Sequence, residues 1–565
     1  MGYFGGFAIR QKTGDALNKD SAAFKLEPIH WALIAVFTLV WFVSLDVRAL
    51  ITPDEGRYAT LSLFMAKTGD WITPRLNGIL YFEKPIMQYW MGAMAFNVLG
   101  VNEFAARFWP GLTGFATVFL TGWFATRLWN ARIGFYAFCV AGSSLFILGN
   151  SHFLTLDMGL TFFLTLALGA FLLAQTAESQ AWRTRFNWLA WAAISGAMLS
   201  KGLVALVIPG MSAIIYMVIK RDWTLLARMN MVSGLLIFAL LAGPWFVVVS
   251  LRNPGFADFF FIHEHFQRFL TDEARREGPI WYFLPMLIAG MLPWTTWLPG
   301  LFKASAAPAS KRFDSRLFLI IWSVFTLVFF SVSKSKLPSY ILPMFPALAM
   351  LVAARIERMS ARDWCWNLVL PGALWAVSIP LFLLSTRIAE RSKNSYDVVH
   401  YALNLVSVGG LLGFIGVLLS ARYALKGDRP KAVLTLAMGG FLAITLLLAG
   451  HERYGHEKSA VDIAPLFKKD LAADAPVFSV AYYDQTLPYY LGRTVTLVNY
   501  SDEFSFGLQH EPEKGMTLDQ FKQKWATLNQ GGALMLKYTY EQLQKEGVAM
   551  KPVYEDSYRV AVIKP

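Results

Sequence analysis

The sequence predicts an all-α polytopic membrane domain followed by a small soluble α/β domain. Two features of the composition support this prediction. The 565 residues are 56% hydrophobic and only 16% charged, whereas soluble proteins are about 45–50% apolar and about 25% charged. Near residue 451 the chain then becomes polar. We therefore expect a transmembrane domain over residues 1–450 and a soluble domain over residues 451–565.

Long apolar runs give the number of membrane spans. A helix needs roughly 20 mostly apolar residues to cross a bilayer, and by this rule we count about thirteen spans. The runs near residues 193 and 210 are separated by Ser200–Gly202, so they are either two spans or one interrupted span. The predicted spans centre near residues 40, 115, 141, 165, 193, 210, 239, 289, 324, 347, 374, 411 and 440.

The distribution of basic residues predicts the orientation. With the N-terminus in the cytoplasm, each cytoplasmic connection is short and rich in lysine and arginine, as the positive-inside rule requires. The opposite loops and the C-terminal domain then lie outside the cytoplasm. We attribute the net charge of +13 to these loops and to anionic lipid headgroups, and not to nucleic acid binding.

The polar C-terminal region has the pattern of an α/β domain. Short β-like runs at 476–480, 494–498, 533–537 and 559–564 flank an amphipathic, helix-like stretch at 518–528. The chain has neither a GxxxxGK[ST] motif nor a strand-linked GxGxxG motif, so ATP-driven work is unsupported.

The first outside loop contains two groups of candidate residues. Asp54 and Glu55 follow a proline, with Arg57 in the next turn, which suggests a carboxylate pair held beside a cation. The alternative is a helix cap with a surface ion pair. The same loop ends in Tyr81–Pro85, where a lysine beside aromatic residues can bind a phosphate or simply extend towards the membrane surface.

Other ionisable residues are predicted at the same membrane face. Asp157 opens an apolar helix, where a carboxylate must cap the helix, pair with a cation or face water. Lys201 lies between two apolar stretches and needs a distant partner. His265, close to Arg268, could be a metal ligand or a proton shuttle. Lys334 and Lys336 are unexpected in a loop outside the cytoplasm and suggest an anionic ligand.

Six motifs in order give the chain a family resemblance. They are PDEGRYA at 53–59, YFEKP at 81–85, Asp157, SKG at 200–202, EHFQRF at 264–269 and SKSKLPSYILP at 333–343. Over residues 30–350 the chain resembles the polytopic glycosyltransferases related to protein O-mannosyltransferases, which have the C-type glycosyltransferase fold. Within them it is most similar to the aminoarabinose transferases of Gram-negative envelopes.

The resemblance implies an inverting transfer of 4-amino-4-deoxy-L-arabinose from undecaprenyl phosphate to lipid A phosphates. The reaction would take place at the periplasmic face of the bacterial inner membrane. Asp54 is carried over as catalytic, with Glu55 beside it and Asp157 as the second acidic position. The residues expected to bind the carrier phosphate or the substrate are Arg57, Tyr81, Lys84, Lys201, Arg268, Lys336 and Tyr340. Glu83 and His265 are candidate ligands for a divalent ion, zinc or magnesium; no cofactor is certain.

Two alternative functions remain open at this stage. One is an enzyme of the same fold that moves a neutral sugar such as mannose from a polyprenyl phosphate to protein or to an envelope glycan. The other is a lipid or ion transporter. Against transport, the ionisable residues gather at one membrane face and do not cross the midplane, as a permeation path would require.

Overall fold

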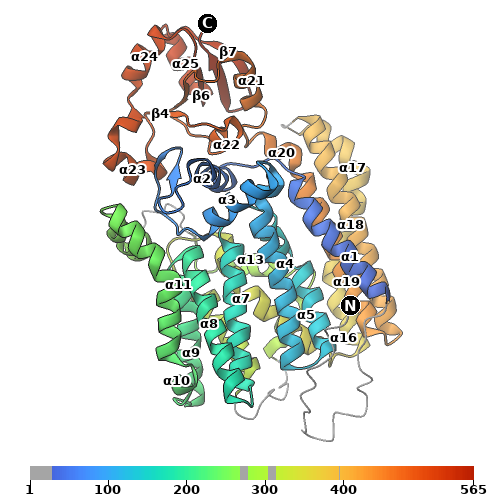
Figure 1. The fold of residues 1–565 in the computed structure, drawn as a ribbon. Coiled ribbons are helices and arrows are strands. Elements are labelled where there is room, and N and C mark those ends of the chain that lie inside the picture. Colours follow the sequence, from blue (N-terminus) through green and yellow to red (C-terminus); the bar gives the residue numbers. More distant parts are fainter. Residues whose placement is uncertain (1–27, 268–277, 303–312, 393–394) are drawn as a thin grey trace, which may run out of the picture.

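The computed structural model describes residues 28–267, 278–302, 313–392 and 395–565. A bundle of long helices forms the membrane domain, and a smaller α/β domain covers one end of it (Figure 1). Helices α2 (Asp54–Thr68) and α3 (Met87–Leu99) lie between the two parts. This arrangement confirms the predicted fold class, a polytopic helical domain followed by an α/β domain.

The bundle is built from helices of very different length. Seven helices among the described residues are long and apolar enough to cross a membrane, or eight if the bent pair α5 and α6 forms one broken span. The bundle helices are α1 (Pro28–Val43), α4 (Glu103–Leu128), α5 (Ala131–Ser143), α6 (Leu145–Ser151), α7 (Asp157–Thr176), α8 (Gln180–Lys201), α9 (Val204–Lys220), α11 (Met231–Arg252), α13 (Phe283–Gly290), α14 (Ser315–Val332), α15 (Phe345–Ile356), α16 (Ala361–Ala376), α17 (Ser378–Arg391), α18 (Tyr396–Leu425) and α19 (Arg429–Gly450).

Most of the predicted spans beyond these seven coincide with helices that are shorter or carry charges. Helix α9 has 17 residues, and the predicted span near residue 289 contains only the eight-residue helix α13. Helix α4 is long but contains Glu103, Arg107 and Arg127. Such helices are stabilised by packing against their neighbours, so their average hydropathy does not show whether they cross the membrane.

The segment from α2 to α3, predicted as the first outside loop, forms a compact layer on top of the bundle (Figure 1). After α2 the chain makes a two-stranded hairpin, β1 (Arg75–Leu76) and β2 (Ile79–Leu80), before it enters α3. The hairpin turn is Asn77–Gly78, and both residues have positive φ. An Asn-Gly pair is favoured in such a tight turn because asparagine and glycine tolerate this conformation.

The C-terminal domain contains a six-stranded sheet in the order β5-β4-β3-β6-β8-β7. Strands β5, β4, β3 and β6 are parallel, and β8 and β7 add antiparallel pairs at one edge. The strands are β3 (Val477–Val480), β4 (Thr496–Val498), β5 (Gly515–Met516), β6 (Gly532–Leu536), β7 (Lys551–Glu555) and β8 (Arg559–Ile563). The helices are α20 (Glu452–His456), α21 (Ile463–Asp470), α22 (Leu487–Leu491), α23 (Ser505–His510), α24 (Leu518–Thr527) and α25 (Lys537–Lys545).

The four β-like runs and the helix-like stretch found in the sequence correspond to β3, β4, β6, β8 and α24. Strands β5 and β7 were not predicted. Strand β5 has only two residues, and β7 is mostly exposed, so neither shows a buried, alternating pattern.

The loop after β3 holds the C-terminal domain against α2. Thr60 Oγ1 donates a hydrogen bond of 3.0 Å to the Gln485 carbonyl oxygen, and Thr52 Oγ1 donates to the Gln485 side chain. The hairpin makes a second contact, because the Asn77 side chain exchanges two hydrogen bonds with the Val495 backbone. The two parts of the molecule therefore meet through paired polar groups.

At Gly56 the backbone of α2 lies close to the backbone of the C-terminal domain. A Cβ atom at this position would lie 2.5 Å from the Gln485 carbonyl carbon and 2.5 Å from the Thr486 nitrogen. Both are backbone atoms, so they cannot move aside as a flexible side chain would. We expect Gly56→Ala to destabilise the protein by about 1–3 kcal/mol, as overpacking does.

Thermal unfolding in detergent checks this expectation through the midpoint temperature. Gly243→Ala is the control, because no heavy atom lies within 4 Å of a Cβ built at Gly243. Equal midpoint temperatures for the two variants would contradict the close approach of α2 and the C-terminal domain.

Candidate active site

A cavity of about 890 Å³ lies between α2 and the bundle. Its polar wall comes from α2, from the loop before α3, and from ends of α7 and α8. Eight of the residues predicted from the sequence line this cavity: Asp54, Glu55, Arg57, Glu83, Lys84, Asp157, Lys201 and Tyr340. The structure thus brings together residues separated by nearly 290 positions, from Asp54 to Tyr340.

The rest of the cavity wall is apolar. Leu160 of α7, one turn after Asp157, and Val207 of α9 form part of this apolar wall. Phe329 and Phe330 at the end of α14 and Met286 of α13 continue this surface. The cavity therefore joins a charged end, next to the C-terminal domain, to an apolar part among the bundle helices.

Asp157 lies at the centre of one charged group. Its carboxylate forms an ion pair with Lys201 Nζ and accepts a hydrogen bond of 3.0 Å from Ser339 Oγ. Lys201 Nζ also lies 4.5 Å from the centre of the Tyr340 ring, within the range of a cation–π contact. Asp157 does not cap α7, since its side chain is engaged by Lys201 and Ser339. Pairing with a cation is thus the correct one of the interpretations left open by the sequence.

Lys84 lies at the centre of a second charged group. Its ammonium group is 3.0 Å from Glu264 Oε2 and donates a hydrogen bond of 2.7 Å to the Glu83 carbonyl oxygen. Glu83 and Glu264 both line the cavity. Lys84 is therefore held at the cavity wall by a carboxylate and does not simply extend to the membrane surface.

Asp54 and Arg57 form the third charged group. Arg57 Nη1 lies 2.9 Å from Asp54 Oδ1, one turn apart on α2. Asp54 is the first residue of α2 and makes no capping hydrogen bond, so the helix cap of the alternative interpretation is wrong, whereas its ion pair with Arg57 is present. Its side chain is 41% exposed, whereas that of Arg57 is 11% exposed. Among the paired carboxylates of the cavity, Asp54 is the one most open to an incoming molecule.

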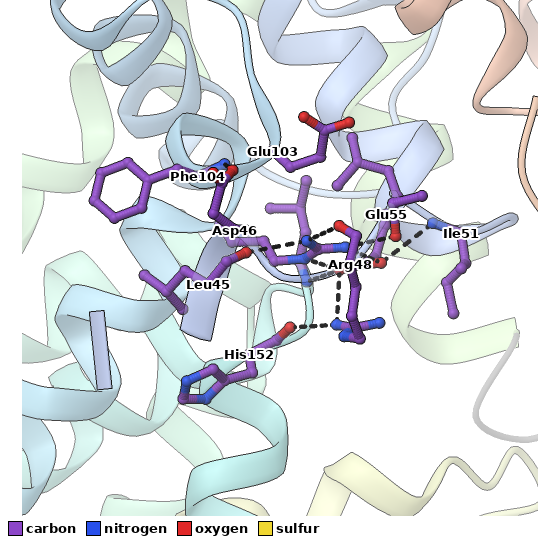
Figure 2. Close-up of polar contacts among 12 residues, drawn as sticks. Leu45, Asp46, Arg48, Ile51, Glu55, Glu103, Phe104 and His152 are labelled. Atoms are coloured by element: carbon purple, nitrogen blue, oxygen red, sulfur yellow. Dashed lines mark hydrogen bonds and ion pairs between the residues drawn. The ribbon is translucent and has the colours of Figure 1, made fainter. Parts of the chain in front are cut away.

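Glu55 points away from this group and binds Arg107 of α4. Arg107 Nε and Nη2 lie 2.7 and 2.8 Å from the two carboxylate oxygens of Glu55. The same carboxylate accepts backbone hydrogen bonds from Leu154 and Ile51. Figure 2 shows the Glu55 carboxylate between Arg48 and Ile51, with the hydrogen bond from Ile51 as a dashed line.

Arg107 is fully satisfied at this position. Besides the two bonds to Glu55, its guanidinium donates to the carbonyl oxygens of Leu45, Arg48 and Ala49, which uses all five of its N–H groups. Arg48 lies next to this pair, with Nη2 3.8 Å from Glu55 and 2.7 Å from the His152 carbonyl oxygen. The result is a buried charged cluster that fixes the loop leading into α2.

The charges around Glu55 also set its protonation. Burial alone would raise the pKa of the Glu55 carboxyl, but Arg107 and Arg48 lower this pKa to about 2. With its pKa lowered in this way, Glu55 is ionised near neutral pH. This geometry favours a role in positioning the loop that carries Asp54.

Two predicted residues, Tyr81 and Lys336, do not line the cavity. The ring of Tyr81 is buried, and its hydroxyl has no hydrogen-bond partner among the described residues. Lys336 is buried as well, and its ammonium group donates to the Ser333 carbonyl oxygen. The side chains of His265 and Arg268 are outside the part of the chain that the structure describes.

The predicted metal site therefore rests on Glu83 alone among the described side chains. Within residues 28–264 and the later described ranges, no group of three or more His, Cys, Asp or Glu side chains is arranged to hold a metal ion. The cavity wall supplies carboxylates from Glu83 and Glu264, of which the second binds Lys84. The metal site stays a prediction.

Sequence reasoning missed three groups of this site. Arg107 could have been found, because a charged residue in an otherwise apolar helix usually has a specific partner. Ser339, by contrast, gave no signal, since a serine beside a proline is common in turns. Glu503 of the C-terminal domain, which binds Arg57, lies in a polar segment without a motif.

Comparisons with known proteins agree with this geometry. A model of the dolichyl-phosphate-mannose-protein mannosyltransferase family matches residues 30–260, and a model of the aminoarabinose transferase C-terminal domain matches residues 463–564. An undecaprenyl phosphate-α-4-amino-4-deoxy-L-arabinose arabinosyl transferase of Aeromonas salmonicida is 35% identical over 421 residues, covering 72% of this chain and 76% of the relative. The chain belongs to this arabinosyl transferase family.

Further members of the arabinosyl transferase family match nearly the whole chain. The second such transferase of Pseudomonas fluorescens is 30% identical over 564 residues, which cover 95% of this chain and 93% of the relative. The crystal structure of ArnT from Cupriavidus metallidurans bound to undecaprenyl phosphate superposes with a TM-score of 0.89 at 35% identity. That match covers 95% of this chain and 99% of the other. The chain is thus a multi-pass membrane glycosyltransferase.

The Glu55–Arg107 pair leads to a stability prediction. Glu55→Gln keeps the shape of the side chain but leaves the Arg107 charge buried without its counter-charge. Breaking a buried pair in this way costs about 3–5 kcal/mol. We expect a clearly lower midpoint of thermal unfolding in detergent.

The exposed Glu541 on α25 provides the matched control for this measurement. Glu541→Gln makes the same chemical change at the surface and should leave the midpoint almost unchanged. If Glu55→Gln unfolded at the same temperature as Glu541→Gln, the Glu55–Arg107 pair would not stabilise the loop that leads into α2.

Proposed function

We propose that this enzyme transfers 4-amino-4-deoxy-L-arabinose from undecaprenyl phosphate to a phosphate group of lipid A. The observation that carries the proposal is the cavity, which joins a charged end to an apolar part. A polyprenyl phosphate has the same two chemical parts. The likeness to a transferase that was crystallised with undecaprenyl phosphate supports this choice of carrier.

The basic residues of the cavity suit a phosphate leaving group. When the bond between the sugar and the phosphate breaks, negative charge develops on the carrier phosphate. Lys84, Lys201 and Arg57 line the cavity and are already held in place by carboxylates. Cations that are held before the reaction stabilise this charge without having to be reoriented.

The carboxylates suit the sugar and the acceptor. Lipid A phosphates are already ionised near neutral pH, so the acceptor needs no strong base. Asp54, which is partly exposed, would orient the acceptor and the donor and stabilise the positive charge that develops on the sugar. Asp157, beside Lys201, would hold the amine or a hydroxyl of the aminosugar. Attack from the face opposite the phosphate would invert the anomeric centre.

The location and domain limits belong to the same proposal. We infer a position in the bacterial inner membrane, with the cavity and the C-terminal domain on the periplasmic side. Among the described basic loops, the one that contains α10 (Leu225–Arg228) lies at the end of the bundle opposite the C-terminal domain (Figure 1). We also divide the chain at residues 450 and 451. This division is supported by the end of α19 at Gly450 and the start of α21 at Ile463.

The mass of lipid A tests this function directly. Cells that lack their own transferase but make the donor would express the wild type or Asp54→Asn. We expect an added aminoarabinose mass with the wild type and at least about a 100-fold lower rate of modification with Asp54→Asn, a typical loss for a misplaced or missing catalytic group.

The control for this experiment is Asp519→Asn, because Asp519 lies on the surface of α24 in the C-terminal domain and its side chain is 88% exposed. An added mass that persists with Asp54→Asn would remove Asp54 from the reaction. A folded wild type that adds a neutral hexose in place of aminoarabinose would overturn the proposed substrate.

Binding of the carrier tests the role of Lys84. Replacing the ammonium group by an amide in Lys84→Gln removes a charge-assisted contact with the phosphate. Such contacts contribute about 1.5–3 kcal/mol, so the dissociation constant of undecaprenyl phosphate should rise roughly 10- to 100-fold.

Native mass spectrometry of the purified protein in detergent measures this constant. Lys522→Gln, on the C-terminal domain, should bind undecaprenyl phosphate as the wild type does. An unchanged constant in Lys84→Gln would show that the phosphate lies elsewhere in the cavity.

A further inference from the structure

A carboxylate of the C-terminal domain reaches into the active-site layer. Glu503 lies in a short turn, Asp502–Phe504, that follows β4, and its side chain is only 5% exposed. Arg57 Nε donates a hydrogen bond of 2.5 Å to Glu503 Oε2, and Arg57 Nη2 pairs with the same oxygen. Glu503 therefore occupies one side of the Arg57 guanidinium.

The other side of that guanidinium belongs to the cavity. Arg57 Nη1 lies 2.9 Å from Asp54 Oδ1, and both residues line the cavity. One arginine is thus shared between two carboxylates, one buried in the C-terminal domain and one open to the substrate. Because the Glu503 side chain is far less exposed than that of Asp54, Glu503 is the fixed member of this trio.

A second chain of contacts holds Glu503 itself. Gln485 Nε2 donates a hydrogen bond of 2.8 Å to Glu503 Oε1, and the Gln485 amide oxygen accepts from Thr52 Oγ1. Thr52 lies two residues before Asp54. The C-terminal domain therefore contacts the catalytic turn from both ends, at Thr52 through Gln485 and at Arg57 through Glu503.

We propose that Glu503 is a positioning residue for the sugar transfer. It holds the Arg57 guanidinium so that Arg57 keeps Asp54 in the cavity, and it limits how strongly Arg57 binds the carrier phosphate. This inference rests on the proposed function and assigns the C-terminal domain a part in the reaction. The role is one of positioning, because Glu503 itself does not line the cavity.

The structure offers a matched control in Glu511. This residue also belongs to the C-terminal domain and also pairs with an arginine of the first outside loop, Arg75, at 2.8 Å. It accepts a further hydrogen bond from the Leu80 backbone but has no link to Asp54. If Glu503 only helped to attach the domain, Glu503→Gln and Glu511→Gln would behave alike.

Steady-state kinetics of the purified, folded enzyme would test the proposal with Glu503→Gln. Without the Glu503 charge, Arg57 can turn towards the phosphate, and Asp54 loses its fixed partner. We expect kcat to fall at least about ten-fold while KM for the lipid-linked donor does not rise. Glu503→Asp, which keeps the charge, should recover part of kcat, and Glu511→Gln should stay close to the wild type.

A binding measurement that needs no turnover completes the test. In Glu503→Gln, Arg57 no longer has a carboxylate that competes with the phosphate. This variant should therefore bind undecaprenyl phosphate about three-fold more tightly. Glu511→Gln should leave the dissociation constant unchanged. A wild type that transfers no sugar would refute the proposed function, but this tightening would still support the sharing of Arg57. Equal kcat in Glu503→Gln and Glu511→Gln, or a weaker affinity for the phosphate in Glu503→Gln, would overturn the inference.

Discussion

The buried ion pair between Glu55 and Arg107 fixes the segments that carry the other charged residues of the site. A guanidinium buried in a helix bundle is stable only when its charge and all its N–H groups have partners, and Arg107 finds these in Glu55 and three backbone carbonyls. Because Glu55 also accepts from the Leu154 backbone, a single carboxylate ties α4, α2 and the segment before α7 together. Asp54 immediately precedes Glu55, and Asp157 follows Leu154 by three positions. The contacts of Glu55 therefore fix the position of both candidate carboxylates.

Around this anchor, three carboxylates of the cavity each pair with a cation. Asp54 pairs with Arg57, Asp157 with Lys201, and Glu264 with Lys84. Isolated charges would be costly so close to apolar walls, whereas paired charges are tolerated and held in fixed positions. A phosphate that enters such a site competes with carboxylates for cations that are already in place. The strength of that competition then sets how tightly the carrier is bound and how easily it leaves.

The C-terminal domain contributes to this arrangement through contacts distant in sequence. Its loop after β3 closes over α2 at Gly56, and its turn at Glu503 binds Arg57. The hairpin at Asn77–Gly78 adds a third contact through the Val495 backbone. A soluble domain that contacts the turn with Asp54 at several points restricts the motion of that turn. Reactions that depend on a small displacement of a carboxylate are sensitive to such restriction.

The sequence by itself determined the class of the protein, the order of its two parts and most of the charged residues of the cavity. Composition and apolar runs are properties of the chain, and motifs such as PDEGRYA and YFEKP bring their charged residues close together locally. Only the tertiary structure decided which charged residues pair with one another. Lys201 needed a carboxylate, but no pattern could assign it to Asp157. The adjacent residues Asp54 and Glu55 bind different arginines, Arg57 and Arg107. The roles of Arg107 and Glu503 were decided in the same way, because long-range ion pairs arise when helices pack and leave no periodic signal in the sequence.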